Sequence, residues 1–188
     1  MMGIALSWVS VKGLAPEEIL SRLELAQTDE ERSYPFEGIV AHPLPQQAFL
    51  VAARGSEHRI LAADSMARLS IGCQALSCDV EEHVGYAACA LWRDGRQLWA
   101  VTYDSDDDPE SVFYKGEVPG RLHELLATVE AMDSEHFEGH FHMDIPLILA
   151  KEYGGFRHDD DDAMFDAIPF AALKDLRGKT SWWKALWR

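Results

Sequence analysis

The clearest pattern of apolar positions lies over residues 86–104, where two apolar runs flank an Asp-Gly pair. Asp-Gly between such runs is the strongest short-range signal for a two-residue β-hairpin turn. We therefore predict two strands joined at Asp94-Gly95. An uninterrupted register places Ala90 opposite Trp99, so that Trp92 and Trp99 share one aromatic face. Because both faces of this ribbon are apolar, it belongs inside a sheet and not at its edge.

The remaining pattern predicts strands alternating with helices. Short alternating or apolar runs indicate strands at residues 4–11, 38–42, 48–53, 74–84 and 111–114. Prolines around residues 38–42 indicate an edge strand there. Helical spacing and end signals indicate helices at residues 16–26, 64–69, 119–132, 144–154 and 169–177, and residues 28–32 are expected to form a polar connector.

This order of elements predicts an α+β fold. We expect a single domain over residues 1–178, with a mostly antiparallel sheet, helices packed on one face and the C-terminal helices partly covering the other. Residues 179–188 are rich in tryptophan and basic side chains. They are expected to form a C-terminal tail that docks on the domain or on a partner.

The hydrophobic content of the chain is ordinary, but its net charge is strongly negative. The chain has 188 residues, of which 47% are hydrophobic, as in an ordinary globular protein. It carries 32 acidic and 17 basic residues, for a net charge of −15. Such a field repels nucleic acid and anionic membranes and favours encounter with basic proteins or metal cations, although solubility alone would also account for it.

The cysteines and the N-terminus indicate a cytoplasmic protein. Three cysteines without C-x-x-C spacing fit buried, reduced thiols better than a disulfide framework. The N-terminus lacks a basic region followed by an apolar run, and no apolar stretch reaches the ~20 residues of a membrane span. The common nucleotide-binding, nucleophile-elbow and zinc-protease motifs are absent. We therefore expect no cofactor and favour a non-enzymatic function.

Three segments carry a resemblance to a known family. SWVSVKG near the start, CDVEEHV before the hairpin and DIPLILAKEYGGFRHD late in the chain resemble an uncharacterised family of small bacterial cytosolic proteins. The resemblance implies a bacterial setting and no particular activity.

Acidic clusters supply the first candidate binding residues. If the hairpin register extends beyond residue 86, one cluster forms at that end of the sheet, and a second run of acids follows His158. The candidates are Glu81, Glu82, His83, Asp104, Asp106, Asp107, Asp159 and Asp160. Carboxylates beside an imidazole could bind a divalent cation or hold a raised pKa for acid–base work. The alternative is a solvated sheet end that prevents edge pairing.

Aromatic and histidine side chains supply two further candidate sites. Trp92, Trp99, Trp183 and Trp187 are candidates for an interface, because tryptophan is enriched in binding hot spots. Alternatively, the tail packs on its own domain. His136, His140 and His142 could supply nitrogen ligands to zinc, although a flexible polar linker fits the same pattern.

Two functional hypotheses follow from these observations. The first is a non-enzymatic protein that binds a basic protein through an acidic surface, in its most specific form an immunity protein that neutralises a basic toxin. The alternative is a metal-dependent hydrolase or small-ligand-binding protein that uses a cluster of histidines and carboxylates. An uncovered aromatic face on the hairpin would also favour a homodimer.

Overall fold

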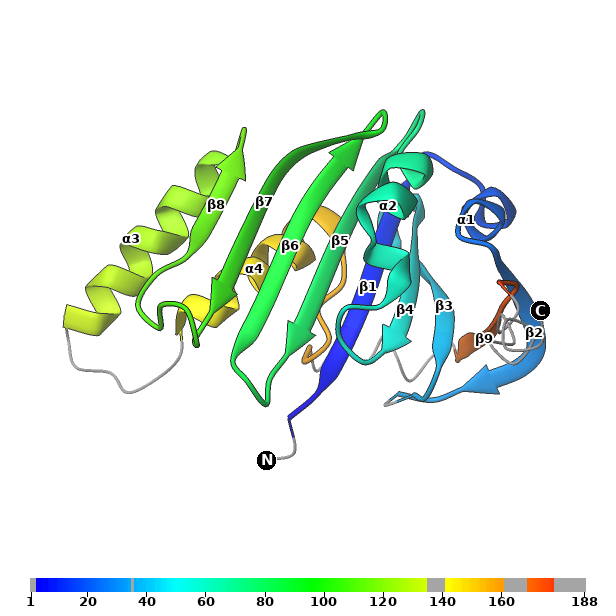
Figure 1. Cartoon of the computed structure of the whole chain (residues 1–188), viewed down its shortest axis with the longest axis horizontal. Helices are drawn as coiled ribbons and strands as arrows, with labels where there is room; N and C mark the ends of the chain where they lie inside the picture. The colour runs from blue at the N-terminus through cyan, green and yellow to red at the C-terminus, as the bar shows by residue number, and fades with distance from the viewer. Residues whose placement is uncertain (1–2, 35, 135–140, 161–168, 178–188) are drawn as a thin grey trace, which may run out of the picture.

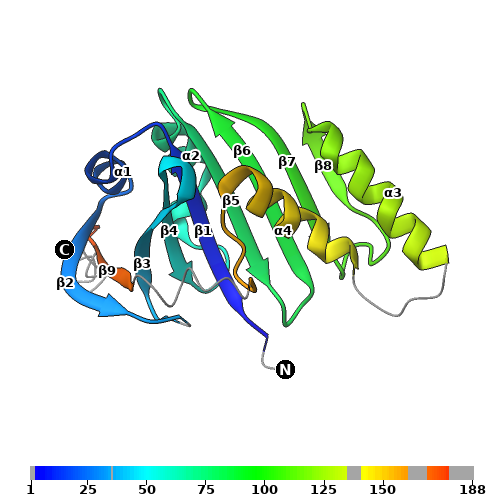
Figure 2. The same ribbon diagram turned by 180° about the vertical axis from the view of Figure 1, so that it is seen from behind.

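The strands of the computed structural model form one sheet (Figures 1 and 2), and the structure describes residues 3–34, 36–134, 141–160 and 169–177. Its nine described strands are β1 (Ala5–Lys12), β2 (Leu25–Arg32), β3 (Ile39–Leu44), β4 (Ala48–Arg54), β5 (Gln74–Glu81), β6 (Tyr86–Arg93), β7 (Arg96–Asp104), β8 (Phe113–Gly116) and β9 (Phe170–Asp175). They are antiparallel neighbours in the order β2-β9-β3-β4-β1-β5-β6-β7-β8. This arrangement confirms the predicted α+β fold.

Helices pack against both faces of this sheet. The α-helices are α1 (Pro16–Arg22), α2 (Ala63–Leu69), α3 (Gly120–Ser134) and α4 (Phe141–Gly154), with short 3-10 turns η1 (Pro45–Gln47) and η2 (Arg59–Leu61). Helices α1 and α2 cover one core, and α3 and α4 cover the other. Figure 1 shows α2 in front of the sheet, whereas α4 crosses β5, β6 and β7 on the opposite face (Figure 2).

Strand β1 lies at the centre of the sheet because its side chains are apolar or small on both faces. Leu6 and Trp8 point into the core under α4, whereas Val9 and Val11 point into the core under α1 and α2. Trp8 is fully buried and packs edge-on against Phe156, with ring centroids 5.3 Å apart. Alternation along one strand therefore supplies both cores.

The predicted hairpin is present, but its register shifts by one residue. Asp94 and Gly95 have positive φ angles of 50° and 78°, as a tight hairpin turn requires. Next to the turn the pairing is the expected one, but beyond it Trp99 lies opposite Leu91 and not opposite Ala90. A β-bulge accounts for the shift, because one extra residue on one strand reverses the faces of all that follow.

The bulge shows that the predicted aromatic face was wrong. Trp99 is 3% exposed and lies under α4, where its ring is 5.6 Å from that of Tyr153. Trp92 lies on the opposite face, half-buried beside the core of α1 and α2. The two tryptophans therefore point in opposite directions and form no shared interface.

Three further predictions were wrong, all at one side of the sheet. Residues 28–32 belong to the edge strand β2 and are not a connector, and residues 170–175 form strand β9 and not a helix. Strand β3 is internal, between β9 and β4, and not an edge strand. Its proline is tolerated because β9 pairs only with Ile39–Ala41, which leaves Pro43 beyond that pairing.

The other predicted helices and strands are present, but several of their boundaries are shifted. Helix α1 ends at Arg22 and not at residue 26, because strand β2 begins at Leu25. Strand β5 ends at Glu81 and not at residue 84. Helix α4 begins at Phe141, one turn before the predicted start at Asp144, and it ends at Gly154 before a left-handed Gly155 with φ of 85°. Asp144 therefore lies in the first turn, where a carboxylate complements the helix dipole.

Candidate functional site

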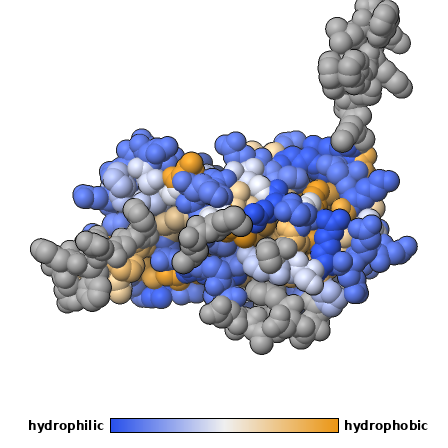
Figure 3. Space-filling model, turned by 90° about the horizontal axis from the view of Figure 1, so that it is seen from below, coloured by the Kyte–Doolittle hydropathy of each residue, from blue (hydrophilic) through white to orange (hydrophobic). Residues whose placement is uncertain are grey.

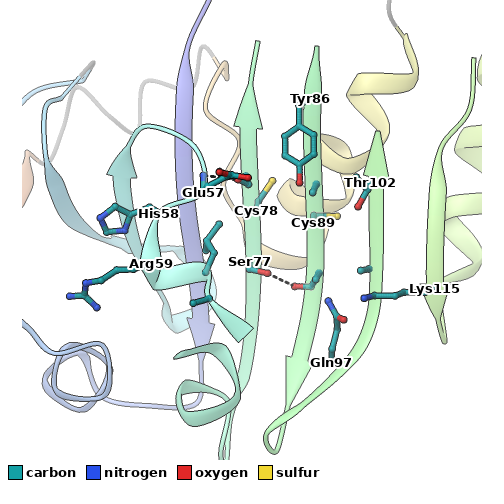
Figure 4. Close-up of a pocket in the computed structure, with 16 residues that line it drawn as sticks. Glu57, His58, Arg59, Ser77, Cys78, Tyr86, Cys89, Gln97, Thr102 and Lys115 are labelled. Carbon is teal, nitrogen blue, oxygen red and sulfur yellow. Dashed lines mark hydrogen bonds between the residues drawn. The ribbon is translucent and has the colours of Figure 1, made fainter. Parts of the chain in front are cut away.

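A hollow of about 410 Å³ lies on the sheet face opposite α4, over β5, β6 and β7 (Figure 4). Among the described residues, no helix lies in front of β6, β7 and β8 on this face (Figure 1). The volume is within the range of roughly 300–1,000 Å³ that is usual for ligand sites. The hollow is lined by Glu57, His58, Arg59, Leu61, Ala62, Ser77, Cys78, Asp79, Tyr86, Ala88, Cys89, Ala90, Gln97, Ala100, Thr102 and Lys115.

The floor of the hollow is made of small side chains that the sheet register places in rows. Ala88 lies opposite Asp79 on one side and opposite Thr102 on the other. Ala90 similarly lies between Ser77 and Ala100. Small residues at neighbouring positions on three strands leave space above the sheet, and this produces the hollow.

Asp79 provides a buried carboxylate at one end of the hollow. Its side chain accepts a hydrogen bond from the Ser7 hydroxyl at 2.6 Å and another from the Glu57 backbone N–H at 2.9 Å. Asp79 is 8% exposed. Burial raises its pKa, and these two hydrogen bonds offset only part of that effect. The carboxylate is thus held in place by a strand and a loop beside it.

The loop that carries Glu57 has a strained backbone. Glu57 has a φ of 54°, a left-handed conformation that costs a non-glycine residue about 1–2 kcal/mol. This conformation directs the Glu57 N–H to Asp79, and the exposed Glu57 side chain lines the hollow.

The charges around Tyr86 make this end of the hollow negative. Burial raises the pKa of Tyr86, and the carboxylates of Asp79, Asp104 and Glu57 raise it further. The hydroxyl therefore remains protonated at neutral pH. Glu81 and Asp104 lie directly opposite Tyr86 on the two neighbouring strands. The loops at this end of the sheet present a largely hydrophilic surface (Figure 3).

The opposite end of the hollow carries Gln97 and Lys115 (Figure 4). Lys115 is three strands away from Asp79, which corresponds to about 14 Å across the sheet, and it lies two residues farther along the strand direction. A second basic residue, Arg59, uses its guanidinium in a two-point ion pair with Asp175, at 2.6 and 2.7 Å. Burial and the charge of Arg59 lower the pKa of His58, so this side chain is neutral at pH 7. The acidic end is therefore not neutralised by the bases that line the hollow.

The predicted acidic cluster at the sheet end is only partly assembled. Glu81 contacts the ring of His83 at 2.6 Å and lies one strand from Tyr86. Asp106 and Asp107 lie in the exposed loop after β7. Strand β5 ends at Glu81, so the pairing does not extend through the following turn.

Glu82 joins the segment after α4 and not this cluster. Its carboxylate lies 2.9 Å from Nε2 of His158, which is 2% exposed, and it also accepts a hydrogen bond from the Ile4 N–H at 2.8 Å. Arg157 bridges Asp144 and Asp159, at 2.5 Å from each. Asp160 pairs with Lys151 at 2.6 Å. The Glu82–His158 contact joins the segment after α4 to the turn after β5, whereas the ion pairs of Arg157 and Asp160 hold that segment against α4 itself.

The remaining predicted residues do not form a site within the described chain. His142 stacks on Tyr103 with ring centroids 6.3 Å apart. His136, His140, Trp183, Trp187 and the tail 179–188 lie outside the described residues. Within residues 3–34, 36–134, 141–160 and 169–177, no group of three or more His, Cys, Asp or Glu side chains is placed to hold a metal ion.

The cysteines are poorly suited to nucleophilic chemistry. Cys78 and Cys89 lie opposite each other on β5 and β6, and both are buried. Burial raises the pKa of both thiols, which keeps them protonated and unreactive at neutral pH.

Sequence reasoning missed the residues that line the hollow. Asp79 was part of a predicted strand, and Glu57 lay between predicted elements with no motif of its own. One available signal was the series of small or polar residues Ser77, Ala88, Ala90, Ala100 and Thr102 on neighbouring strands. The one-residue shift at the bulge concealed their alignment.

Comparisons with known proteins found no matching family model, no similar curated protein and no similar solved structure. None of the described helices combines the length and the apolar character that crossing a membrane requires.

Proposed function

We propose that this chain is a non-enzymatic bacterial cytoplasmic protein that binds a basic protein through the open face of β5–β8. The most specific form of this proposal is an immunity protein that neutralises a basic toxin, such as a nuclease. The observation that carries it is the arrangement of Glu57, Asp79 and Asp104 around Tyr86, at one end of a sheet face that no described helix covers.

Charge and chemistry both support this proposal. A net charge of −15 attracts a basic partner over a distance, and carboxylates at the edge of the open face would orient it on contact. In the described part of the chain, the thiols are protonated and no group of side chains is arranged for a metal ion. Among the described residues, which do not include His136 and His140, no observation favours the alternative of a metal-dependent hydrolase.

Calorimetric titration against the protein encoded by the neighbouring gene, purified as an inactive variant, tests the proposal. We expect binding that weakens on the order of tenfold as salt rises from about 50 to about 300 mM, because salt screens attraction between exposed charges. A chelator should not change the affinity. Binding that is insensitive to salt, or a neighbouring protein that is not basic and does not bind, would contradict the proposal.

A pair of matched variants localises the interface. Glu57→Gln with Asp104→Asn removes two carboxylates beside the hollow, and Asp29→Asn with Glu31→Gln removes two from β2, at the far edge of the sheet. Both pairs change the net charge equally. The first should weaken binding on the order of tenfold, which is about 1.4 kcal/mol, and the second by much less. Equal effects would mean that overall charge, and not this face, determines binding.

A further inference from the structure

The hollow on the open face has the chemistry of a pocket for one extended cationic side chain. Its floor is apolar along Ala88, Ala90 and Ala100, which suits an aliphatic stem. Glu57 and the Tyr86 hydroxyl lie at one end (Figure 4), together with Asp79, which accepts the hydrogen bond from the Glu57 N–H. A charged head could meet these groups there. Its other end opens beside Lys115 and Gln97.

We propose that this hollow receives a single arginine side chain of the protein partner, with its guanidinium against Asp79, Glu57 and Tyr86. This inference rests on the proposed function and names the group that the acidic end recognises. In this proposal, one arginine side chain of the partner enters the hollow, and the rest of the partner contacts the surface around it.

The acceptors favour a guanidinium over an ammonium ion. Asp79 uses one hydrogen bond at each carboxylate oxygen, from Ser7 and from the Glu57 N–H, and each oxygen can accept more than one. The acceptors come from a strand, a loop and a neighbouring strand, so they are spread out and not gathered at one point. A planar group with five donors meets such a set better than a compact ammonium, and it can also stack on the Tyr86 ring.

The surroundings of Asp79 support a cationic occupant. Asp79 is 8% exposed, and the guanidinium of Arg59, another residue that lines the hollow, is already bound to Asp175. A buried carboxylate without a cationic partner is costly, and an arriving guanidinium would reduce that cost. Lys115 at the opposite end disfavours a second cation and sets the direction in which the side chain lies.

The test uses N-acetyl-arginine amide as the probe, with N-acetyl-citrulline amide as its uncharged isostere and N-acetyl-lysine amide as the ammonium analogue. Each is titrated into the full chain while backbone amide resonances are followed by NMR. We expect the arginine amide to shift the resonances of Tyr86, Ala88 and Thr102, with a dissociation constant on the order of 1 mM. The citrulline amide should give no saturable shift, and the lysine amide should bind more weakly than the arginine amide.

Two variants and one control assign the effect to the hollow. Asp79→Asn removes the buried charge, and Ala88→Leu fills the floor while leaving every carboxylate in place. Each should weaken arginine amide binding by at least about tenfold. Asp106→Asn makes the same charge change as Asp79→Asn in an exposed loop and should bind like the wild type. Ala88→Leu keeps the test valid if Asp79→Asn does not fold.

Several outcomes would overturn the inference: citrulline amide binding as well as arginine amide, lysine amide binding more tightly, or Asp79→Asn and Ala88→Leu both matching Asp106→Asn. These outcomes are distinguishable from failure of the proposed function. If the basic neighbour binds both variants of the hollow with wild-type affinity, the inference fails and the proposed function stands. If arginine amide occupies the hollow but no basic protein binds, the proposed function fails.

Discussion

At the scale of single residues, Asp79 shows how a buried carboxylate is held without a basic partner among the described residues. The Ser7 hydroxyl and the Glu57 N–H both donate to it, but the carboxylates of Glu57 and Glu81 act against its charge. The net result of burial and these contacts is a raised pKa. A group in this state makes stability depend on pH.

The pH dependence of unfolding should change when Asp79 is replaced by Asn. A carboxyl with a raised pKa holds its proton more tightly in the folded chain than in the unfolded one. Its contribution to stability is therefore complete below the ordinary value of 3.8 and is lost as the pH rises through the raised pKa. The amide of the variant carries no charge at any of these pH values. We thus expect Asp79→Asn to become more favourable relative to the wild type between about pH 4 and about pH 7, as measured by urea unfolding.

Asp106→Asn provides the matched control for that measurement. Asp106 lies in an exposed loop, and its replacement makes the same change in net charge. The difference in pH dependence between the two variants therefore isolates the effect of burying the carboxyl group. If the stability of Asp79→Asn relative to the wild type were constant over this pH range, the raised pKa of Asp79 would be refuted.

At the scale of elements, signals from neighbouring residues predicted the turn and the helices, but they failed for strands whose pairing partners are far away in the sequence. The Asp94-Gly95 turn and helices α1 and α3 could be predicted because their signals lie within a few residues. Strand β9 could not, because Phe170 and Leu173 fit a helical spacing as well as a strand buried on both sides. Its position between β2 and β3 depends on partners more than 100 residues away.

The candidate site was unpredictable for a related reason. Its negative charge was visible in composition, but the hollow depends on the pairing of β5, β6 and β7 beyond the bulge. No rule that uses neighbouring residues alone reveals where one extra residue is inserted. The acids Glu81 and Asp104 were therefore identified, whereas Asp79 and Glu57 were not.

Strand β8 should depend on a glycine at its end. Gly116 has a φ of 80°, and a Cβ there would collide with the carbonyl oxygen of Leu98 on β7. We expect Gly116→Ala to destabilise the fold by more than about 2 kcal/mol and to separate β8 from β7, because neither backbone can move without breaking the pairing. Hydrogen exchange at Tyr114 and Lys115 measures the separation, and thermal unfolding measures the stability.

Gly120 is the control for that substitution. It begins α3 and lies outside the left-handed region, and a Cβ added to it would meet no atom within 4 Å. Gly120→Ala should leave stability unchanged or raise it slightly. Similar losses in the two variants would mean that the collision with Leu98 is not what makes glycine necessary at residue 116.

At the scale of the whole molecule, the last described strand in the sequence joins the edge strand β2 to the rest of the sheet. β9 is the only described strand paired with β2, and it connects β2 to β3. A chain ending at Ile168 lacks β9, whereas one ending at Arg177 keeps every described strand. We expect the shorter chain to lose cooperative unfolding, because β2 and the core side chains Phe170 and Leu173 lose their partners. Circular dichroism melts of the two truncations make the comparison, and equal melts would contradict it.

The net charge should also make folding and binding respond to salt in opposite directions. The chain has 32 acidic and 17 basic residues, and the excess negative charges repel one another in the compact folded state. Salt ions screen this repulsion. Attraction to a basic partner is screened by the same ions. Raising monovalent salt should therefore raise the melting temperature of the free chain, by about 2–4 °C for each 1 kcal/mol of repulsion relieved, while it weakens the complex. Calorimetric melts and binding titrations in the same buffers measure both effects. A melting temperature that falls with salt would contradict this prediction and would show that ion pairs such as those of Arg157 with Asp144 and Asp159 outweigh the overall repulsion.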